Sequence, residues 1–176
     1  SVNRIILDDG YDGSLGSMLC ETITVSGITG SDFTSELDVQ MSHSWPGDLA
    51  IKLLNPADDV LGLMSRPGLA EAADDGTGCC GSSADIEATS VLSFADDAAT
   101  SAEDLAGCAA AGTCEISPAP STIAGVADLQ ALSTGSANGD WELCVGDSGG
   151  GDFGFVTDIT LKILEGVTTV PTLHMP

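Results

Sequence analysis

Hydrophobic and polar residues alternate with a period of two along several short stretches of the chain. In SELDVQM, Leu37, Val39 and Met41 alternate with polar residues, and DLAIKLL, WELCV and TDITLKIL repeat the pattern. Because successive side chains of a strand point to opposite faces, the alternation predicts antiparallel strands with one buried face and one face in water. CETITV and VLGLM predict two further strands, and ATSVLSF predicts a weaker one.

Segments rich in glycine, aspartate, asparagine and serine separate these strands, as in DDGYDG, SGITGSD, NPADD and SANGD. Many short strands joined by such turns predict an all-β sandwich or jelly roll. Residues 66–126 lack this regularity and predict long loops folded onto the sandwich, with a helical turn in SAEDLAGCAAAGTC. We expect one domain over residues 1–165 and a linker or tail over residues 166–176.

The chain has six cysteines, namely Cys20, Cys79, Cys80, Cys108, Cys114 and Cys144. Their spacing matches no zinc or redox motif, and an even number favours disulfides in an oxidising compartment. Together with the absence of a visible signal peptide, this predicts a mature or excised piece of a secreted, extracellular precursor.

The alternation also indicates how the cysteines pair. Cys20 and Cys144 share faces with polar residues, so both are predicted to point outward and to join the first strand to a late one. The two adjacent cysteines at 79–80 are then expected to pair with Cys108 and Cys114, in either order. The alternative, in which Cys108 bonds Cys114, requires a bond between the adjacent cysteines, which rarely reach disulfide geometry without strain.

The chain is strongly acidic. Its 176 residues include 4 lysines and arginines and 27 aspartates and glutamates, for a formal net charge of −23. Such a surface disfavours nucleic acid and anionic membranes as partners and suits a cationic partner or a divalent cation. No apolar run approaches the roughly 20 residues of a membrane helix. We expect a monomer when the chain is isolated.

The segment GDSGG at residues 146–150 is the string that surrounds the nucleophilic serine of chymotrypsin-like proteases, with Ser148 at the serine position. That chemistry needs a histidine base held by an acid. The sequence offers only His43, in SHSWPGD, and His174, in the terminal tail. A tight glycine-rich connection between two strands is the favoured interpretation, in which Asp147 and Asp152 make turn hydrogen bonds or bind a cation.

Three stretches together resemble the P domain, also called the homo B domain, of subtilisin-like proprotein convertases such as kexin and furin and of secreted bacterial proteases. SHSWPGDLAIKLLNPADDVLGLMSRPG resembles the family's THTWxGDLxIxL core. CGSSADIEATSVLSFADDAA and LSTGSANGDWELCVGDSGGGDFGFVTDITLKI are similar to the segments that follow it. The resemblance covers residues 15–164 and has the family's order and spacing.

The resemblance implies a jelly-roll β-sandwich, like a galactose-binding domain, that follows a subtilisin-like catalytic domain in the same precursor. It implies a non-catalytic accessory function, namely stabilising or helping to fold the catalytic domain and tuning its calcium or pH dependence. It also implies structural roles for the motif residues His43, Trp45, Gly47, Trp141 and Gly154.

Two other functions stay open on the sequence. A module that binds a protein or polysaccharide would use exposed aromatic side chains, for which Tyr11, Trp45 and Phe153 are the best candidates. A protease that uses Ser148 is the least favoured. Separately, calcium binding is predicted because hard cations take oxygen ligands from converging loops. The candidate ligands are Asp48, Asp85, Asp96, Asp97, Asp147 and Asp152.

Overall fold

The computed structural model describes residues 3–78, 80–107 and 112–166 of the chain. Within these ranges the chain forms nine strands: β1 Arg4–Ile5, β2 Leu19–Val25, β3 Phe33–His43, β4 Leu49–Leu54, β5 Val60–Ser65, β6 Val91–Phe94, β7 Thr113–Ile116, β8 Gly139–Asp147 and β9 Gly154–Glu165. The helical segments are short: η1 Leu15–Ser17, η2 Pro46–Asp48, η3 Ala102–Gly107 and α1 Leu129–Leu132. None of the described helices is long and apolar enough to cross a membrane.

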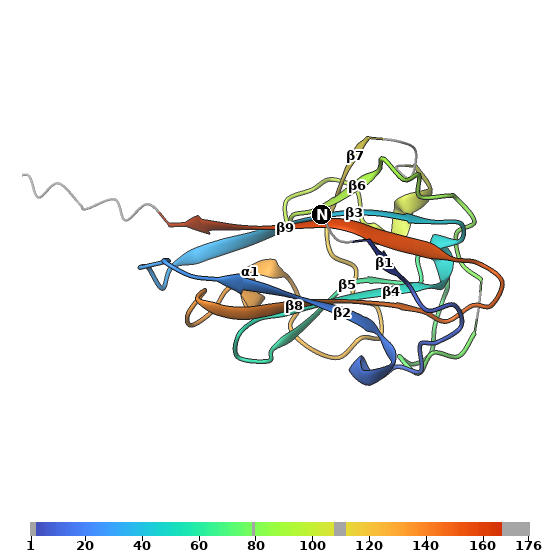
Figure 1. Cartoon of the computed structure of the whole chain (residues 1–176), viewed down its shortest axis with the longest axis horizontal. Helices are drawn as coiled ribbons and strands as arrows, with labels where there is room; N and C mark the ends of the chain where they lie inside the picture. The colour runs from blue at the N-terminus through green and yellow to red at the C-terminus, as the bar shows by residue number, and fades with distance from the viewer. Residues whose placement is uncertain (1–2, 79, 108–111, 167–176) are drawn as a thin grey trace, which may run out of the picture.

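The described strands form two sheets packed face to face (Figure 1). One sheet has the order β1-β9-β3-β6-β7, and the other has the order β2-β8-β4-β5. All pairings are antiparallel except β6 with β7, which is parallel. The predicted all-β sandwich is therefore confirmed.

The core lies between the two sheets and is built from the alternating apolar positions. Leu37, Val39 and Met41 of β3 are fully buried and belong to one core cluster with Trp141 and Leu143 of β8. The indole Nε1 of Trp141 donates to the carbonyl of Ala137 over 2.9 Å, so this large side chain is buried with its polar atom satisfied.

The prediction that each strand has one wet face is wrong for β4, whereas β2 of the same sheet does alternate between partly buried and exposed residues. All six residues of β4 are buried, Lys52 among them. A second apolar cluster lies on the outer side of this sheet, where Tyr11, Ala50 and Cys144 pack together. The segments before β2 and after β5 cover that side, which period-two alternation cannot reveal.

Residues 66–126 are more ordered than the predicted long loops. They contribute β6, the weaker strand predicted in ATSVLSF, and β7, which was not predicted from the sequence. The predicted helical turn is η3. β7 has only four residues, with burial alternating from exposed to buried, and that is too short a pattern to distinguish from a loop.

The predicted disulfide between Cys20 and Cys144 is present and joins β2 to β8 across 124 positions of the chain. Cys20 is exposed, but Cys144 is buried beneath the covering segments instead of pointing into water. Cys80 and Cys114 are each disulfide-bonded. Cys79 and Cys108 lie outside the described residues, as do residues 167–176 of the predicted tail, so the second pairing stays a prediction.

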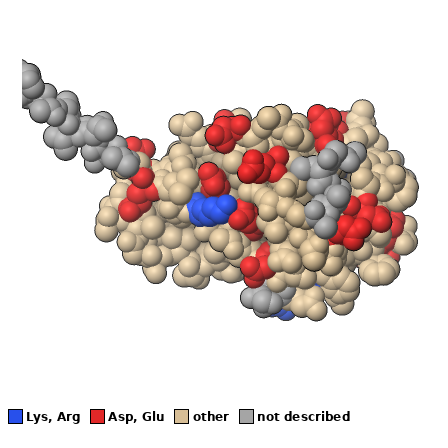
Figure 2. Space-filling view, turned by 90° about the horizontal axis from the view of Figure 1, so that it is seen from above, with Lys and Arg blue, Asp and Glu red and all other residues tan. Residues whose placement is uncertain are grey.

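All four basic side chains are paired with acids. Arg4 pairs with Glu21, Lys52 with Asp74, Arg66 with Glu71, and Lys162 with Asp38 and Glu36; the exposed surface thus carries a large excess of uncompensated acid. Figure 2 shows acidic side chains spread over one face, with few basic ones among them.

Candidate functional site

The two motif segments, SHSWPGD and GDSGGGDFG, meet at one end of the sandwich. The first contains the end of β3 and η2, and the second joins β8 to β9. His43 Nε2 lies 3.1 Å from Asp147 Oδ2, and both side chains are fully buried. A second link runs from Ser44 Oγ, which donates to Asp152 Oδ1 over 2.9 Å. More than a hundred positions of sequence separate the members of each pair, so the fold brings these segments together.

The hydrogen bonds of His43 and Ser148 do not form a catalytic relay. The main-chain N–H of Trp45 donates to His43 Nδ1 over 3.1 Å, so both ring nitrogens are engaged and Nε2 carries the proton shared with Asp147. The Ser148 hydroxyl donates to the carbonyl of Asp48 over 3.1 Å. Across the part of the chain that the structure describes, no hydrogen bond joins His43 to Ser148. His174 lies outside that part.

Glycine is required at two of the motif positions by close approach. A Cβ on Gly47 would lie 2.3 Å from the Ser82 nitrogen, because the segment that contains Ser82 crosses directly over this turn. A Cβ on Gly149 would lie 2.0 Å from Asp48 Oδ2. Within GDSGG, Gly149 is thus explained by the packing of this connection against η2, and Gly146 by its contact with the Tyr11 ring, which a Cβ would approach to 2.6 Å.

Asp48 is the most perturbed acid in this region. It is 2% exposed, and its Oδ1 has no hydrogen-bond partner among the described residues. The pKa of Asp48 is raised to about 6, chiefly by burial and next by the nearby charges of Asp147 and Asp152, which outweigh the lowering by His43 and Arg66. A buried acid that lies near two other acids therefore keeps its proton to a higher pH than an exposed one.

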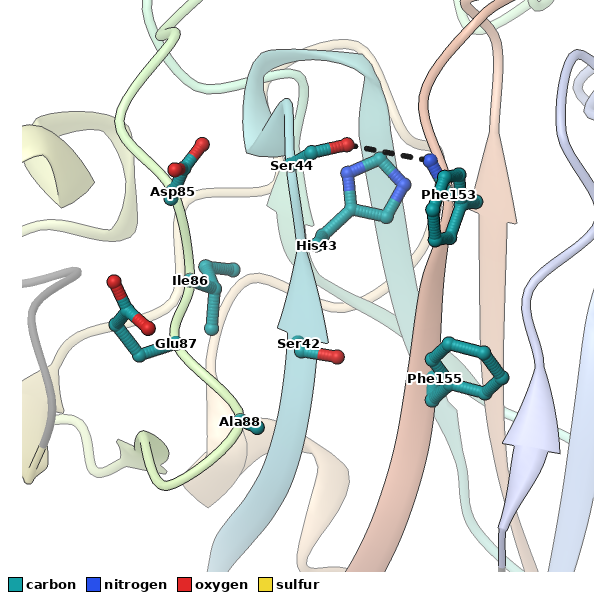
Figure 3. Close-up of a pocket in the computed structure, with 9 residues that line it drawn as sticks. All are labelled: Ser42, His43, Ser44, Asp85, Ile86, Glu87, Ala88, Phe153 and Phe155. Carbon is teal, nitrogen blue, oxygen red and sulfur yellow. Dashed lines mark hydrogen bonds between the residues drawn. The ribbon is translucent and has the colours of Figure 1, made fainter.

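The three aromatic side chains predicted to be exposed differ in their placement. Tyr11 is 4% exposed, so the prediction is wrong for it. Trp45 is half-buried, and Phe153 is 65% exposed. Phe153 and Phe155 line a hollow of about 230 Å³, which Figure 3 shows beside the end of β3.

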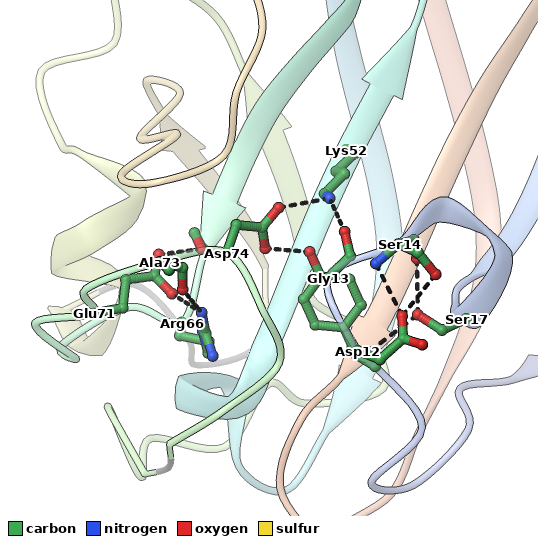
Figure 4. Close-up of polar contacts among 11 residues, drawn as sticks. Asp12, Gly13, Ser14, Ser17, Lys52, Arg66, Glu71, Ala73 and Asp74 are labelled. Atoms are coloured by element: carbon green, nitrogen blue, oxygen red, sulfur yellow. Dashed lines mark hydrogen bonds and ion pairs between the residues drawn. The ribbon is translucent and has the colours of Figure 1, made fainter.

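A polar cluster that was not predicted from the sequence lies at the loop after β5 (Figure 4). The Arg66 guanidinium pairs with Glu71, with 0% and 1% of the two side chains exposed, and donates to the carbonyls of Thr77 and Ala73 over 2.7 and 3.0 Å. Lys52 Nζ donates to Asp74 Oδ2 over 2.8 Å.

The hydroxyl of Tyr11 donates to the other oxygen of Asp74, and burial followed by this bond raises the pKa of the tyrosine. One sequence signal could have pointed to this cluster. The chain has only 4 lysines and arginines, and Lys52 is one of them although it lies within an apolar strand pattern.

The six aspartates proposed as calcium ligands fall in separate places. Asp48, Asp147 and Asp152 surround the motif turn, and Asp85 is exposed at the hollow. Asp96 accepts the N–H groups of Leu129 and Gln130 at the start of α1, and Asp97 is exposed beside it. In the described ranges, no three or more His, Cys, Asp or Glu side chains are arranged to hold a metal ion. These residues do not fit a single calcium cage, and calcium binding stays a prediction.

Neither the protein-family models nor the curated proteins include a match to this chain. Among solved structures, the chain is similar to the serine protease of Aeromonas sobria, with a TM-score of 0.48 and 15% identity over 94% of this chain and 26% of that one. It is similar to the complex of Aeromonas sobria serine protease with the chaperone ORF2, with a TM-score of 0.48 and 15% identity over 93% and 26% of the two chains.

Proposed function

We propose that this chain is a non-catalytic accessory domain of a secreted subtilisin-like serine protease. The observation that carries the proposal is that the two segments resembling the P domain hold each other together through His43, Asp147, Ser148 and Asp48. Because these polar groups bond one another within a buried turn, the motif serves the architecture of the sandwich. The disulfide between Cys20 and Cys144 agrees with an oxidising, extracellular setting.

The mechanism follows from linked equilibria. A rigid domain that binds only the folded catalytic domain shifts that domain's folding equilibrium toward the native state. Covalent tethering raises the effective concentration to the millimolar range. At about a thousand times the dissociation constant, binding adds about 4 kcal/mol to the free energy of unfolding.

The pH dependence of Asp48 supports a further part of the proposal. Since its pKa is raised to about 6, the stability of this domain changes in mildly acidic conditions, and a tethered catalytic domain would sense the change. No part of the proposal depends on calcium.

The decisive experiment compares the parent precursor with and without this segment. We expect the precursor that lacks residues 1–165 to give a lower yield of folded protease and a shorter half-life on heating. The matched control replaces the segment by a glycine-serine linker, which separates loss of the domain from loss of chain length. Equal yields and half-lives in the three proteins would contradict the proposed function.

A further inference from the structure

The hollow beside Phe153 is a trough on the outer face of the five-stranded sheet. Three segments lie next to one another there: residues 85–87, the end of β3, and the start of β9 (Figure 3). Ile86 pairs with His43 through reciprocal main-chain hydrogen bonds of 3.1 and 2.9 Å, and His43 is opposite Gly154 of β9. Ile86, His43 and Gly154 are buried and point into the core. The residues directly before and after each of them along the chain therefore point outward.

The outward-pointing residues form two similar rows across the trough. In one row, Phe155 is opposite Ser42, and the antiparallel register places Glu87 on the other side of Ser42. The second row is made in the same way by Phe153, Ser44 and Asp85. Each row therefore has an aromatic residue, a small serine and an acidic residue, and the backbones of the aromatic and acidic residues lie about 10 Å apart, which is twice the spacing of neighbouring strands.

The walls of the trough are chemically distinct and open to solvent. Phe153 is 65% exposed and meets Phe155 edge to face with ring centroids 6.5 Å apart. Ile5, which is 61% exposed, lies opposite Phe155 on β1 and extends the apolar wall. Asp85 and Glu87 are exposed, and the four basic side chains of this chain all pair with other acids. The trough thus lacks a cationic group of its own.

We propose that this trough binds an extended segment of a partner protein that carries two arginine or lysine side chains two residues apart. The rows are about 6.8 Å apart along the strands, which is the spacing of side chains on one face of an extended peptide. Each aliphatic stem would lie over the serine and against the phenylalanine, with its charged head at the carboxylate. Arginine adds attraction to the face of an aromatic ring.

This inference deepens the proposed function. It rests on that function in one respect, namely that the partner is a protein. It names the surface and chemistry of that contact. A carbohydrate ligand is disfavoured because the rings of Phe153 and Phe155 meet edge to face and form no flat platform for stacking on a sugar. Because the whole chain is acidic, any cationic peptide would be weakly attracted, so the test must separate the trough from general charge.

The test is a titration of the isotopically labelled chain with two synthetic peptides, followed by NMR. The first peptide, Ac-Gly-Arg-Ser-Arg-Gly-amide, has the proposed spacing, and the second, Ac-Gly-Arg-Arg-Ser-Gly-amide, has the same composition with adjacent arginines. We expect the first to bind about fivefold more tightly, the equivalent of about 1 kcal/mol, and to shift the amide signals of Ser42, Ser44 and Phe155. Equal affinity of the two peptides would overturn the proposal.

Variants locate the binding within the trough. Phe153→Ser and Glu87→Gln should each weaken the first peptide about fivefold, because each removes one wall of a row. Asp97→Asn and Leu164→Ser, which change exposed residues elsewhere, should weaken it less than about twofold. If Asp97→Asn weakens binding as much as Glu87→Gln, the attraction is general and the trough is not a site. Either result leaves the comparison of protease yields unaffected, so the two proposals fail separately.

Discussion

Replacing Arg66 with alanine is expected to lower the free energy of unfolding by about 3 to 5 kcal/mol, the range seen when one partner of a buried ion pair is removed. Arg66 is fully buried, and its guanidinium is paired with Glu71 and bonded to the carbonyls of Thr77 and Ala73. The substitution leaves the Glu71 carboxylate buried without its counter-charge and the two carbonyls without donors. Urea unfolding followed by circular dichroism measures the loss.

The matched control is Lys162→Ala. Lys162 also pairs with acids, at 2.9 Å from Asp38, but its side chain is 37% exposed, so its loss should change stability by less than about 1 kcal/mol. Should Arg66→Ala prove too unstable to measure, Arg66→Lys keeps the charge but not the paired donors, and an intermediate loss is expected. Equal effects of Arg66→Ala and Lys162→Ala would contradict the role given to this cluster.

Replacing Asp48 with asparagine is expected to stabilise the chain at pH 8 by about 1 to 3 kcal/mol and to change it little at pH 4. In the folded chain the pKa of Asp48 is raised to about 6, above its value of about 3.9 in the unfolded chain. At pH 4 the folded chain holds the proton and about half of the unfolded chains do, so the charge penalty of the buried carboxyl is small.

As the pH rises from 4 to 6, the unfolded chain releases this proton before the folded chain does, so the contribution of Asp48 to stability falls; above pH 6 it stays at its lowest. Asparagine is neutral throughout and avoids the loss. The measurement is the difference in unfolding free energy between the variant and the original chain at both pH values. Asp97→Asn, at an exposed site, controls for the lower net charge. A gain from Asp48→Asn that is the same at pH 4 and pH 8 would show that burial of its charge is not the cause.

Most of the sandwich could be predicted from the sequence because the alternation of apolar and polar residues within a strand indicates which residues face the core. Leu37, Val39 and Met41 face the core since the residues between them do not, and the same holds for Trp141 and Leu143. The link between Cys20 and Cys144 followed from that alternation, although the burial of Cys144 did not. Cys144 is covered by segments that are remote in sequence, and the residues of WELCV give no sign of them.

The polar sites could not be predicted for the same reason. Tyr11 and Asp74 are 63 positions apart, and both belong to turn-rich segments without periodicity. The two rows of the trough depend on the register of three segments, of which residues 85–87 pair with β3 only through an isolated bridge. The connection around Ser148 could be predicted, because its glycines favoured a tight turn between two strands over a catalytic serine loop.

The most direct test of the non-catalytic interpretation is mass analysis of the folded chain after incubation with a serine-directed fluorophosphonate. The hydroxyl of Ser148 donates to the carbonyl of Asp48, and His43 is engaged by Asp147 and Trp45. The account therefore predicts an unchanged mass. A single adduct mapped to Ser148, and lost in His43→Ala, would contradict it.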